Sequence, residues 1–528
     1  MDRTSHRISF LTIALLLTVS VVIPGTADHR DRTHGGWLRN GSRLGTGNTY
    51  YVSTSGNDNN PGTMSQPWRT IQHAANSVAA GDTVEVFAGI YNEHINVPVS
   101  GNSVAGPITF QSYPGQTATV DGTGLDIPNG QYGLFNISNQ SYVTIQGFEV
   151  RNYTTSKASQ VPIGIYLNGA GAHLQILNNH IHDISTTAKG CAANAFGMTV
   201  YGTQAPASIN NLTISGNEID HTVTGCSETL SVDGNVQYFV ITQNLVHDDN
   251  NIAVGAIGFE GVAPRKAMCG SDPCDRARDG YIGENAIYNI TSYGNPAYGK
   301  QYAADGIYVD GGTRIIIERN LIHNVDLGIE LASEHHLRTS DHVIARSNLI
   351  YFGNSAGISI GGYAAGKGGT DSCYIVNNSL LFNDSKNTGS GEFQVQFHAT
   401  NNVFENNIAY ATTQGLMVNN FTKSEPNPVL TDYNVWYSTV GESVATFVWY
   451  HKHYKGFAAY QQASGQDAHS FFADPRYLDL NEPNLQVQPT SPAVNAGHNL
   501  GERIVGTEDF AGNPRVQRSN IDIGAYEQ

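Results

Sequence analysis

Basic residues are scarce in this chain, and so are long apolar segments. Its 528 residues contain 28 Lys and Arg against 45 Asp and Glu, which gives a formal net charge of −17. Nucleic acids and anionic membranes would repel such a chain, so we exclude both as partners. A polyanionic glycan would also be repelled unless a bound cation bridged it to the protein. No segment after Ile23 is apolar and long enough to cross a bilayer, so we expect no membrane insertion.

The first residues are typical of an export signal. A short basic stretch precedes an apolar run from Ile8 to Ile23, and the small residues ending at Ala27 suit cleavage. A membrane anchor is the alternative, but the run is short for a bilayer span. We therefore expect a signal peptide over 1–27, a flexible linker over 28–48, and a secreted protein, extracellular or periplasmic.

Cysteine is also rare, with five in the whole chain. Export would permit disulfides. Cys269 and Cys274 bracket a four-residue turn, "GSDP", and can close a small loop. Cys191 and Cys226 lie in loops near equivalent positions and can also pair, whereas Cys373 falls inside a predicted strand as a buried thiol. Sequence alone does not prove this connectivity.

Helical periodicity is nearly absent, while a recurring asparagine reveals repeats. The asparagine follows a short apolar segment at separations of 27 to 41 residues, which a unit of a little under 30 residues with insertions explains. Units of strands and turns predict a parallel β-helix rather than a helical solenoid or propeller. Asparagine side chains stacked in register can also bond to one another, which predicts a ladder. The ladder residues are Asn179, Asn217, Asn244, Asn285, Asn320, Asn348, Asn378 and Asn407.

A second strand of each unit also aligns and defines two interior columns, because alternate residues of a strand share a face. The first column is Ile165, Met198, Leu230, Ile257, Ile307, Ile329, Ile358, Val395 and Leu416. The second column is Leu167, Val200, Val232, Phe259, Val309, Leu331, Ile360, Phe397 and Val418.

The position after the second column faces outward and carries acids on three consecutive turns: Asp233, Glu260 and Asp310. Stacked strands lie about 4.8 Å apart, so these distant acids should become neighbours. Like charges on adjacent strands destabilise a sheet, which favours a catalytic set or a bound cation over a merely solvated acidic surface. We expect the same face and its loops to bind substrate through Tyr201, Tyr308, Glu330, Glu334, His398 and Lys300.

Histidines 182, 247 and 323 form another outward column, each three residues after a ladder asparagine. Tyr288 and Tyr351 occupy the same column, so we interpret it as aromatic stacking rather than a metal site.

Two long insertions interrupt the repeats beside the acidic column. Residues 262–280 and 291–304 flank the turns of Glu260 and Asp310. Insertions in solenoids often frame the binding face, so we expect them to form the walls of a cleft.

The ends of the repeat array need caps. Residues 68–80 have the spacing of a short helix with Ile71, Ala74, Ala75 and Val78 on its apolar side. We expect an N-terminal cap with the first turns over 49–125, β-helix repeats over 126–430, and an irregular C-terminal cap over 431–528.

The opening segment resembles that of secreted β-helix proteins of the pectate-lyase-like superfamily. It carries "SGNDNNPG" at Ser55, "TIQHAA" at Thr70 and "GDTV" at Gly81. The closing segment, "DFAGNPRVQRSNIDIGAYEQ", resembles the ending of many exported bacterial β-helix proteins. The resemblance implies an all-β, right-handed parallel β-helix and a carbohydrate-active enzyme. The sequence contains no clustered "DDGWD"-like calcium motif, and "HDDNN" from His247 matches that motif only in part.

Three functions are compatible with these residues. A glycoside hydrolase needs two carboxyl groups about 5 Å apart for retention or roughly 6.5 to 9.5 Å for inversion, and Asp310 with Glu260 would form that pair, supported by Asp233. In a Ca²⁺-dependent polysaccharide lyase the same three acids would hold the ion, and Lys266, Lys300 or Arg276 would supply the base. A non-catalytic carbohydrate-binding solenoid is the third possibility. In each case we expect a monomer whose partner is a poly- or oligosaccharide. Ca²⁺ is the one cofactor that the residues suggest, and it belongs to the lyase hypothesis.

Overall fold

The structure, a computed structural model, describes residues 47–423, 425–480, 483–517 and 520–528. The expected signal peptide and nearly all of the expected linker lie outside the described residues. No helix in the described ranges is both long and apolar enough to span a bilayer.

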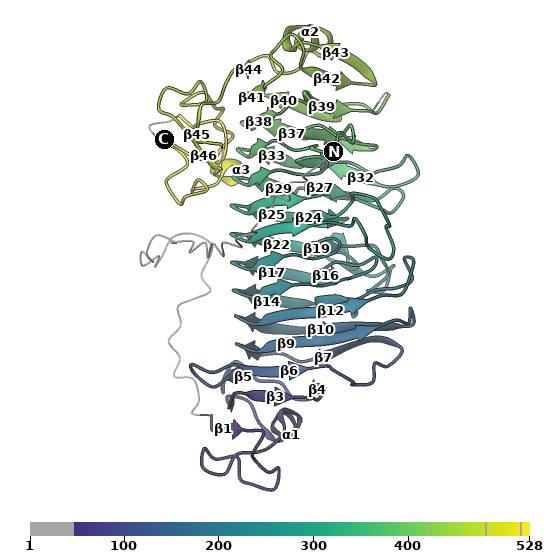
Figure 1. The fold of residues 1–528 in the computed structure, drawn as a ribbon, viewed down its shortest axis with the longest axis vertical. Helices are drawn as coiled ribbons and strands as arrows, with labels where there is room; N and C mark the ends of the chain where they lie inside the picture. Colours follow the sequence, from purple (N-terminus) through teal and green to yellow (C-terminus); the bar gives the residue numbers. More distant parts are fainter. Residues whose placement is uncertain (1–46, 424, 481–482, 518–519) are drawn as a thin grey trace, which may run out of the picture. The chain divides into compact units, whose positions relative to one another are not determined.

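Three long, mainly parallel sheets run along the stack of turns (Figure 1). Each complete turn adds one strand to each sheet. For example, β14 (Ile209–Ser215), β15 (Glu218–Asp220) and β16 (Leu230–Gly234) belong to sheet 1, sheet 2 and sheet 3, respectively. The next turn repeats this order with β17 (Val236–Thr242), β18 (Leu245–His247) and β19 (Val254–Ile257). The predicted right-handed parallel β-helix is confirmed.

The predicted asparagine ladder is also present, between sheets 1 and 2. Nδ2 of Asn179 donates to Oδ1 of Asn217 at 3.0 Å, and the same bond recurs turn after turn. The ladder continues one step beyond the prediction, from Asn407 to Asn434 at 3.4 Å. Every member is buried, and its Nδ2 also donates to a backbone carbonyl. The ladder therefore satisfies polar groups along one edge of the apolar interior.

The predicted interior columns are correct for most turns but wrong in register at two places. Val232 pairs with Ala256 rather than with Phe259, so β19 ends three residues earlier than predicted. Val254 and Ala256 fill the interior there, and Phe259 (φ 71°) lies beyond the strand where the chain turns away.

The second register error lies near the C-terminal end of the repeats. Ile358 pairs with Phe393, and Ile360 with Val395, so these interior positions are two residues earlier than predicted. On the following strand Phe393 pairs with Val418, so the first interior position there is Val418, two residues later than the predicted Leu416. The sequence offers two alternating apolar patterns at each place, and only the packing of neighbouring turns selects one.

Short helices cover both ends of the solenoid. α1 spans Ile71–Ser77, shorter than the expected 68–80, and Thr70 caps it by accepting the His73 amide at 3.1 Å. At the other end, strands continue past residue 430 through β42 (Thr446–Trp449), and α2 (Phe457–Ser464) packs on them.

The last residues fold back beside the repeats (Figure 1). α3 (Glu502–Val505) contacts β29 (Ile344–Arg346) and β33 (Tyr374–Val376). The fully buried Arg515 guanidinium donates to the Ser347 hydroxyl at 2.8 Å. This segment therefore covers the side of the solenoid rather than its end.

Both disulfides occur as the sequence suggested, joining Cys191 to Cys226 and Cys269 to Cys274. Cys373 is a buried free thiol.

Candidate active site

Acidic side chains gather along the outer side of sheet 3. Asp233 lies near the end of β16, and Asp310 is the last residue of β24 (Asp305–Asp310). Asp233 is paired with Ile257, and Asp310 with Ala332 on the following strand, β27 (Leu327–Ala332). Both aspartates are buried.

Glu260 reaches this region from a loop and not from a strand. Because β19 ends at Ile257, Glu260 is exposed beyond it and does not stack in the column with Asp233 and Asp310. Its Oε1 nevertheless lies 3.0 Å from Nε2 of His335. One donor atom from each of Glu260, Asp310 and His335 lies within 4.8 Å of the others. Glu260 and Asp310 are therefore close to each other, as expected. Glu260 approaches from a loop, however, and not from the strand position in which the sequence alignment placed it.

Glu334 links the group to a lysine. Its backbone amide donates to Oδ1 of Asp310 at 2.8 Å, and its carboxylate is 3.2 Å from Nζ of Lys367. The Tyr308 hydroxyl lies 3.4 Å from the same carboxylate. Lys367 and His335 were not among the predicted site residues, because both lie in loops whose lengths vary from turn to turn.

The two central carboxyl groups have opposite electrostatic surroundings. Burial, together with the neighbouring Glu334 and Glu260 carboxylates, raises the pKa of Asp310 well above its usual value. The hydrogen bond from His335, aided by its positive charge and that of Lys367, lowers the pKa of Glu260. Asp310 is therefore disposed to hold a proton while Glu260 is ionised.

Asp233 belongs to the same acidic region. Its Oδ1 is buried and has no hydrogen-bond partner in the described part of the chain. Burial and the nearby Glu228 and Glu260 raise its pKa. Burial also raises the pKa of Glu228 to about 7. Tyr201 pairs in register with Asp233 on the adjacent strand, as the sequence alignment placed it.

Glu330 and Tyr308 are paired on adjacent strands, as predicted. Burial and Glu334 raise the pKa of Glu330 to about 7. Asp305, at the start of β24, has a buried Oδ1 without a partner among the described residues. Tyr308 is only 6% exposed, so its ring does not present a face to solvent.

Two other predicted substrate-binding residues lie away from the carboxylates. His398 does not share the outward column, because of the shifted register described above. It lines a cavity of about 250 Å³ together with Arg338, Lys367 and Glu425. Lys367 connects this cavity to the carboxylates through Glu334. Lys300 is exposed on the loop before β24.

The insertion 262–280 contacts the turn that follows Asp310, through Arg276. Arg276 donates to the carbonyls of Gly311 and Gly312 at 2.8 and 2.9 Å and to the Asp341 carboxylate at 2.8 Å. A guanidinium held in this way fixes the turn after Asp310 and is not free to act as a base. From the insertion 291–304, Tyr298 lies near Glu228, and burial together with that carboxylate raises the pKa of Tyr298 to about 12.

The histidine column stacks as predicted along part of its length. Ring centroids lie 4.8 Å apart between His247 and Tyr288, 5.1 Å between Tyr288 and His323, and 4.9 Å between His323 and Tyr351. His182 instead stacks on the ring of His180 at 4.4 Å.

Comparisons with known proteins agree with this fold. The family model described as the Pel9A-like, right-handed β-helix region matches residues 50–212. The solved structure of a complex of XylC with xylose has a TM-score of 0.52 at 12% identity, covering 91% of this chain and 99% of that chain, which speaks for the fold alone. The fold and its opening segment define a pectate-lyase-like right-handed parallel β-helix protein.

Two proteins that are similar in sequence define the family more narrowly than the fold does. The chain is 35% identical to Bacillus subtilis protein YwoF over 450 residues, which cover 85% of this chain and 92% of that protein. It therefore belongs to the same family as YwoF. Pectate lyase PEL9 of Emericella nidulans is 27% identical over 146 residues, which cover 26% of this chain and 32% of that enzyme.

Proposed function

We propose that this protein is an extracellular glycoside hydrolase in which Glu260 and Asp310 are the catalytic pair. The observation that carries the proposal is the opposite electrostatic surroundings of two carboxyl groups, one oxygen of each lying within 4.8 Å of the other. Pairs of acids whose pKa values are pushed apart in this way divide the roles of acid and nucleophile.

The short separation favours retention of anomeric configuration, since retaining enzymes hold their carboxyl groups about 5 to 5.5 Å apart. The ionised Glu260 would attack the anomeric carbon as the glycosidic C–O bond breaks. The proton of Asp310 would pass to the departing oxygen. Water would then attack the glycosyl ester on Glu260, give its proton to Asp310 and free both carboxyl groups for the next cycle.

The neighbouring residues have supporting roles in this proposal. His335 keeps Glu260 ionised through the 3.0 Å bond, and the Glu334 amide positions Asp310. The cavity beside Lys367 and His398 offers room for a sugar unit next to the reacting bond. The partial similarity to a pectate lyase supports a carbohydrate substrate, and the two disulfides are typical of exported proteins.

A Ca²⁺-dependent polysaccharide lyase is the second candidate, favoured by the same similarity and by the closeness of the Glu260 and Asp310 oxygens. Ca²⁺ takes six to eight oxygen ligands, which these carboxylates would begin to supply. The lyase base is harder to assign. Arg276 donates hydrogen bonds through Nε and Nη2, and the pairing of Lys367 with Tyr363 and Glu334 raises the pKa of the Lys367 ammonium group. The other base candidates, Lys266 and Lys300, are exposed on loops.

A glycan panel tests the proposal. New reducing ends without the ultraviolet absorbance of unsaturated uronates are expected from hydrolysis, and NMR should show retained configuration in the first product. Glu260→Gln and Asp310→Asn should each lower kcat by about 10² to 10⁴. The exposed Glu442 provides the matched control, and Glu442→Gln should leave the rate unchanged.

Each other result has a definite meaning. Uronate absorbance that a chelator abolishes would replace hydrolysis by the lyase reaction. Glycan binding without cleavage, unaffected by Asp310→Asn, would indicate a carbohydrate-binding solenoid. Full activity in both site variants would refute the assignment of Glu260 and Asp310.

A further inference from the structure

A second group of histidines and carboxylates lies on sheet 2, away from the carboxylates of sheet 3. We name it the sheet 2 cluster; it consists of His180, Glu218, Asp220, His221 and His247. Its residues come from three consecutive turns, on β12 (His180–Thr186), β15 and β18, and from the residue after β15. The proposed hydrolase makes no use of it.

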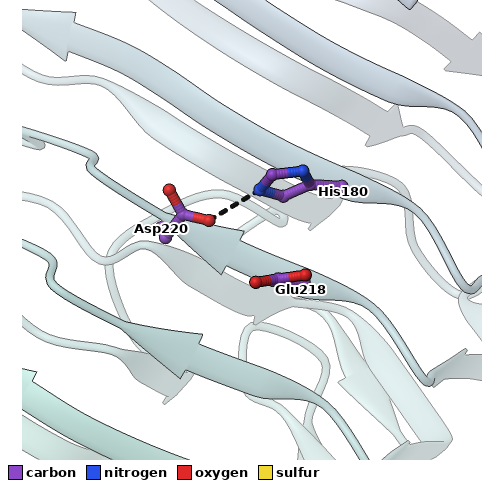
Figure 2. Close-up of side chains that lie close together, drawn as sticks. All are labelled: His180, Glu218 and Asp220. Carbon is purple, nitrogen blue, oxygen red and sulfur yellow. Dashed lines mark hydrogen bonds and ion pairs between the residues drawn. The ribbon is translucent and has the colours of Figure 1, made fainter. Parts of the chain in front are cut away.

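Asp220 is the centre of the cluster. Nε2 of His180 lies 2.6 Å from its Oδ2, and Nδ1 of His221 bonds its Oδ1. Figure 2 shows the His180 ring pointing at this carboxylate, with Glu218 beside them on the same strand as Asp220. Oxygen or nitrogen atoms of His180, Glu218 and Asp220 all lie within 4.8 Å of one another.

His247 completes the arrangement from the next turn. Its Nδ1 lies 2.7 Å from a carboxylate oxygen of Asp248, while Nε2 faces Oε1 of Glu218 at 3.3 Å and Oδ2 of Asp220 at 4.0 Å. Histidines that bind metals are typically held in this way, with one ring nitrogen on a carboxylate and the other directed at the ion. The ring plane is fixed as well, by stacking on Tyr288 at 4.8 Å.

Two of the four side chains are exposed enough to solvent for an ion to reach the cluster. The side chains of Asp220 and His247 are 7% and 12% exposed, whereas those of His180 and Glu218 are 40% and 45% exposed. The two buried groups are thus fixed by the sheet, and the two open ones can adjust.

We propose that the sheet 2 cluster binds one divalent transition-metal ion of the Zn²⁺ class. The ligands are Nε2 of His180 and His247 and carboxylate oxygens of Asp220 and Glu218. Two imidazoles with two carboxylates suit Zn²⁺ better than Ca²⁺, which prefers oxygen alone.

The distances are close to those that such an ion needs. Tetrahedral ligands at about 2.0 to 2.2 Å from Zn²⁺ are roughly 3.3 Å from one another. Nε2 of His247 is already 3.3 Å from Glu218 and 4.0 Å from Asp220. His180 and Asp220, at 2.6 Å, would exchange their hydrogen bond for two bonds to the ion by moving slightly apart.

The ion would join three successive turns of the solenoid. The Cys191–Cys226 disulfide already links the loops that follow β12 and β15, the first two of these turns. The same turns continue directly into the strands of Tyr201 and Asp233, and the third leads to the loop of Glu260. Metal binding would therefore stabilise the part of the stack that carries the proposed active site, without touching a substrate.

The test is direct binding to the whole chain after treatment with EDTA. Calorimetric titration with Zn²⁺ should show one saturable site, Ca²⁺ should not compete for it, and Zn²⁺ should raise the unfolding temperature. His180→Gln and His247→Gln should each weaken Zn²⁺ binding at least tenfold. X-ray absorption of the loaded protein should show imidazole ligands at about 2.0 Å.

Two matched controls distinguish this site from other histidines. His323→Gln removes a stacked ring of the same column that lies next to Asn324 instead of a carboxylate, and it should bind Zn²⁺ normally. His335→Gln removes the histidine beside Glu260 and should also bind normally. Absence of a saturable Zn²⁺ site, or unchanged binding in both His180→Gln and His247→Gln, would overturn the proposal. Loss of binding in His335→Gln would overturn it as well, by locating the ion on sheet 3.

Discussion

Replacing one member of the asparagine ladder should destabilise the protein far more than its small size suggests. We choose Asn285, between β22 (Arg278–Gly283) and β23 (Ala286–Ile290), because its turn continues into the strand of Asp310. Its Nδ2 donates to the Ile241 carbonyl at 3.1 Å and to Oδ1 of Asn320 at 2.9 Å. Its Oδ1 accepts from the backbone and side-chain amides of Asn244, both at 3.0 Å.

Asn285→Ala removes all four bonds from a site that is 1% exposed. A buried hydrogen bond contributes about 1 kcal/mol net, and a buried donor left without a partner costs about 1 to 3 kcal/mol. Three of the bonds count at about 1 kcal/mol each, and the Asn244 backbone amide would be left without an acceptor, so we expect the free energy of unfolding to fall by about 4 to 6 kcal/mol. The side chain of the exposed Asn96 accepts one bond, from the Tyr132 hydroxyl at 3.3 Å, and Asn96→Ala should cost less than about 0.5 kcal/mol.

Urea unfolding followed by circular dichroism measures both variants against the parent. A loss below about 1 kcal/mol in Asn285→Ala, or one equal to that of Asn96→Ala, would refute the reasoning that the ladder stabilises the stack. Dependence of the result on the spectroscopic probe would show that the turns do not unfold together, as can happen in repeat proteins.

The remaining predictions concern pH and the disulfide. The proposed hydrolysis needs Asp310 protonated and Glu260 ionised, so its rate should fall below the lowered pKa of Glu260 and above the raised pKa of Asp310; a rate independent of pH would contradict these roles. His335→Gln removes the hydrogen bond that lowers the pKa of Glu260, so the acidic limb of the profile should move to higher pH, and an unmoved limb would show that His335 does not act on Glu260. Replacing Cys191 and Cys226 by serine, at a sequence separation of 35, should lower the free energy of unfolding by about 3 to 4 kcal/mol; a denaturation midpoint equal to that of the parent would exclude a stabilising role.

The stack itself could be predicted from sequence, because its signals repeat. Each turn contains one ladder asparagine and a run of alternating apolar residues. Because this pattern recurs in many turns, a misaligned turn does not prevent its recognition. The positions of Asp233 and Asp310 followed for the same reason, since each directly follows a well-defined interior residue, Val232 or Val309. The disulfide Cys269–Cys274 was predictable because its loop is short.

The sequence by itself thus determined the coil, the ladder and which side of it carries the acids. Only the tertiary structure decided how the acids meet. Glu260 was expected in a strand, yet it approaches Asp310 from a loop, where His335 bonds it. Strand positions follow from a period of two residues, but loop positions depend on contacts between segments that share no period, such as the 75-residue separation between Glu260 and His335. The burial of Asp310, which raises its pKa, is likewise a property of the assembled turns.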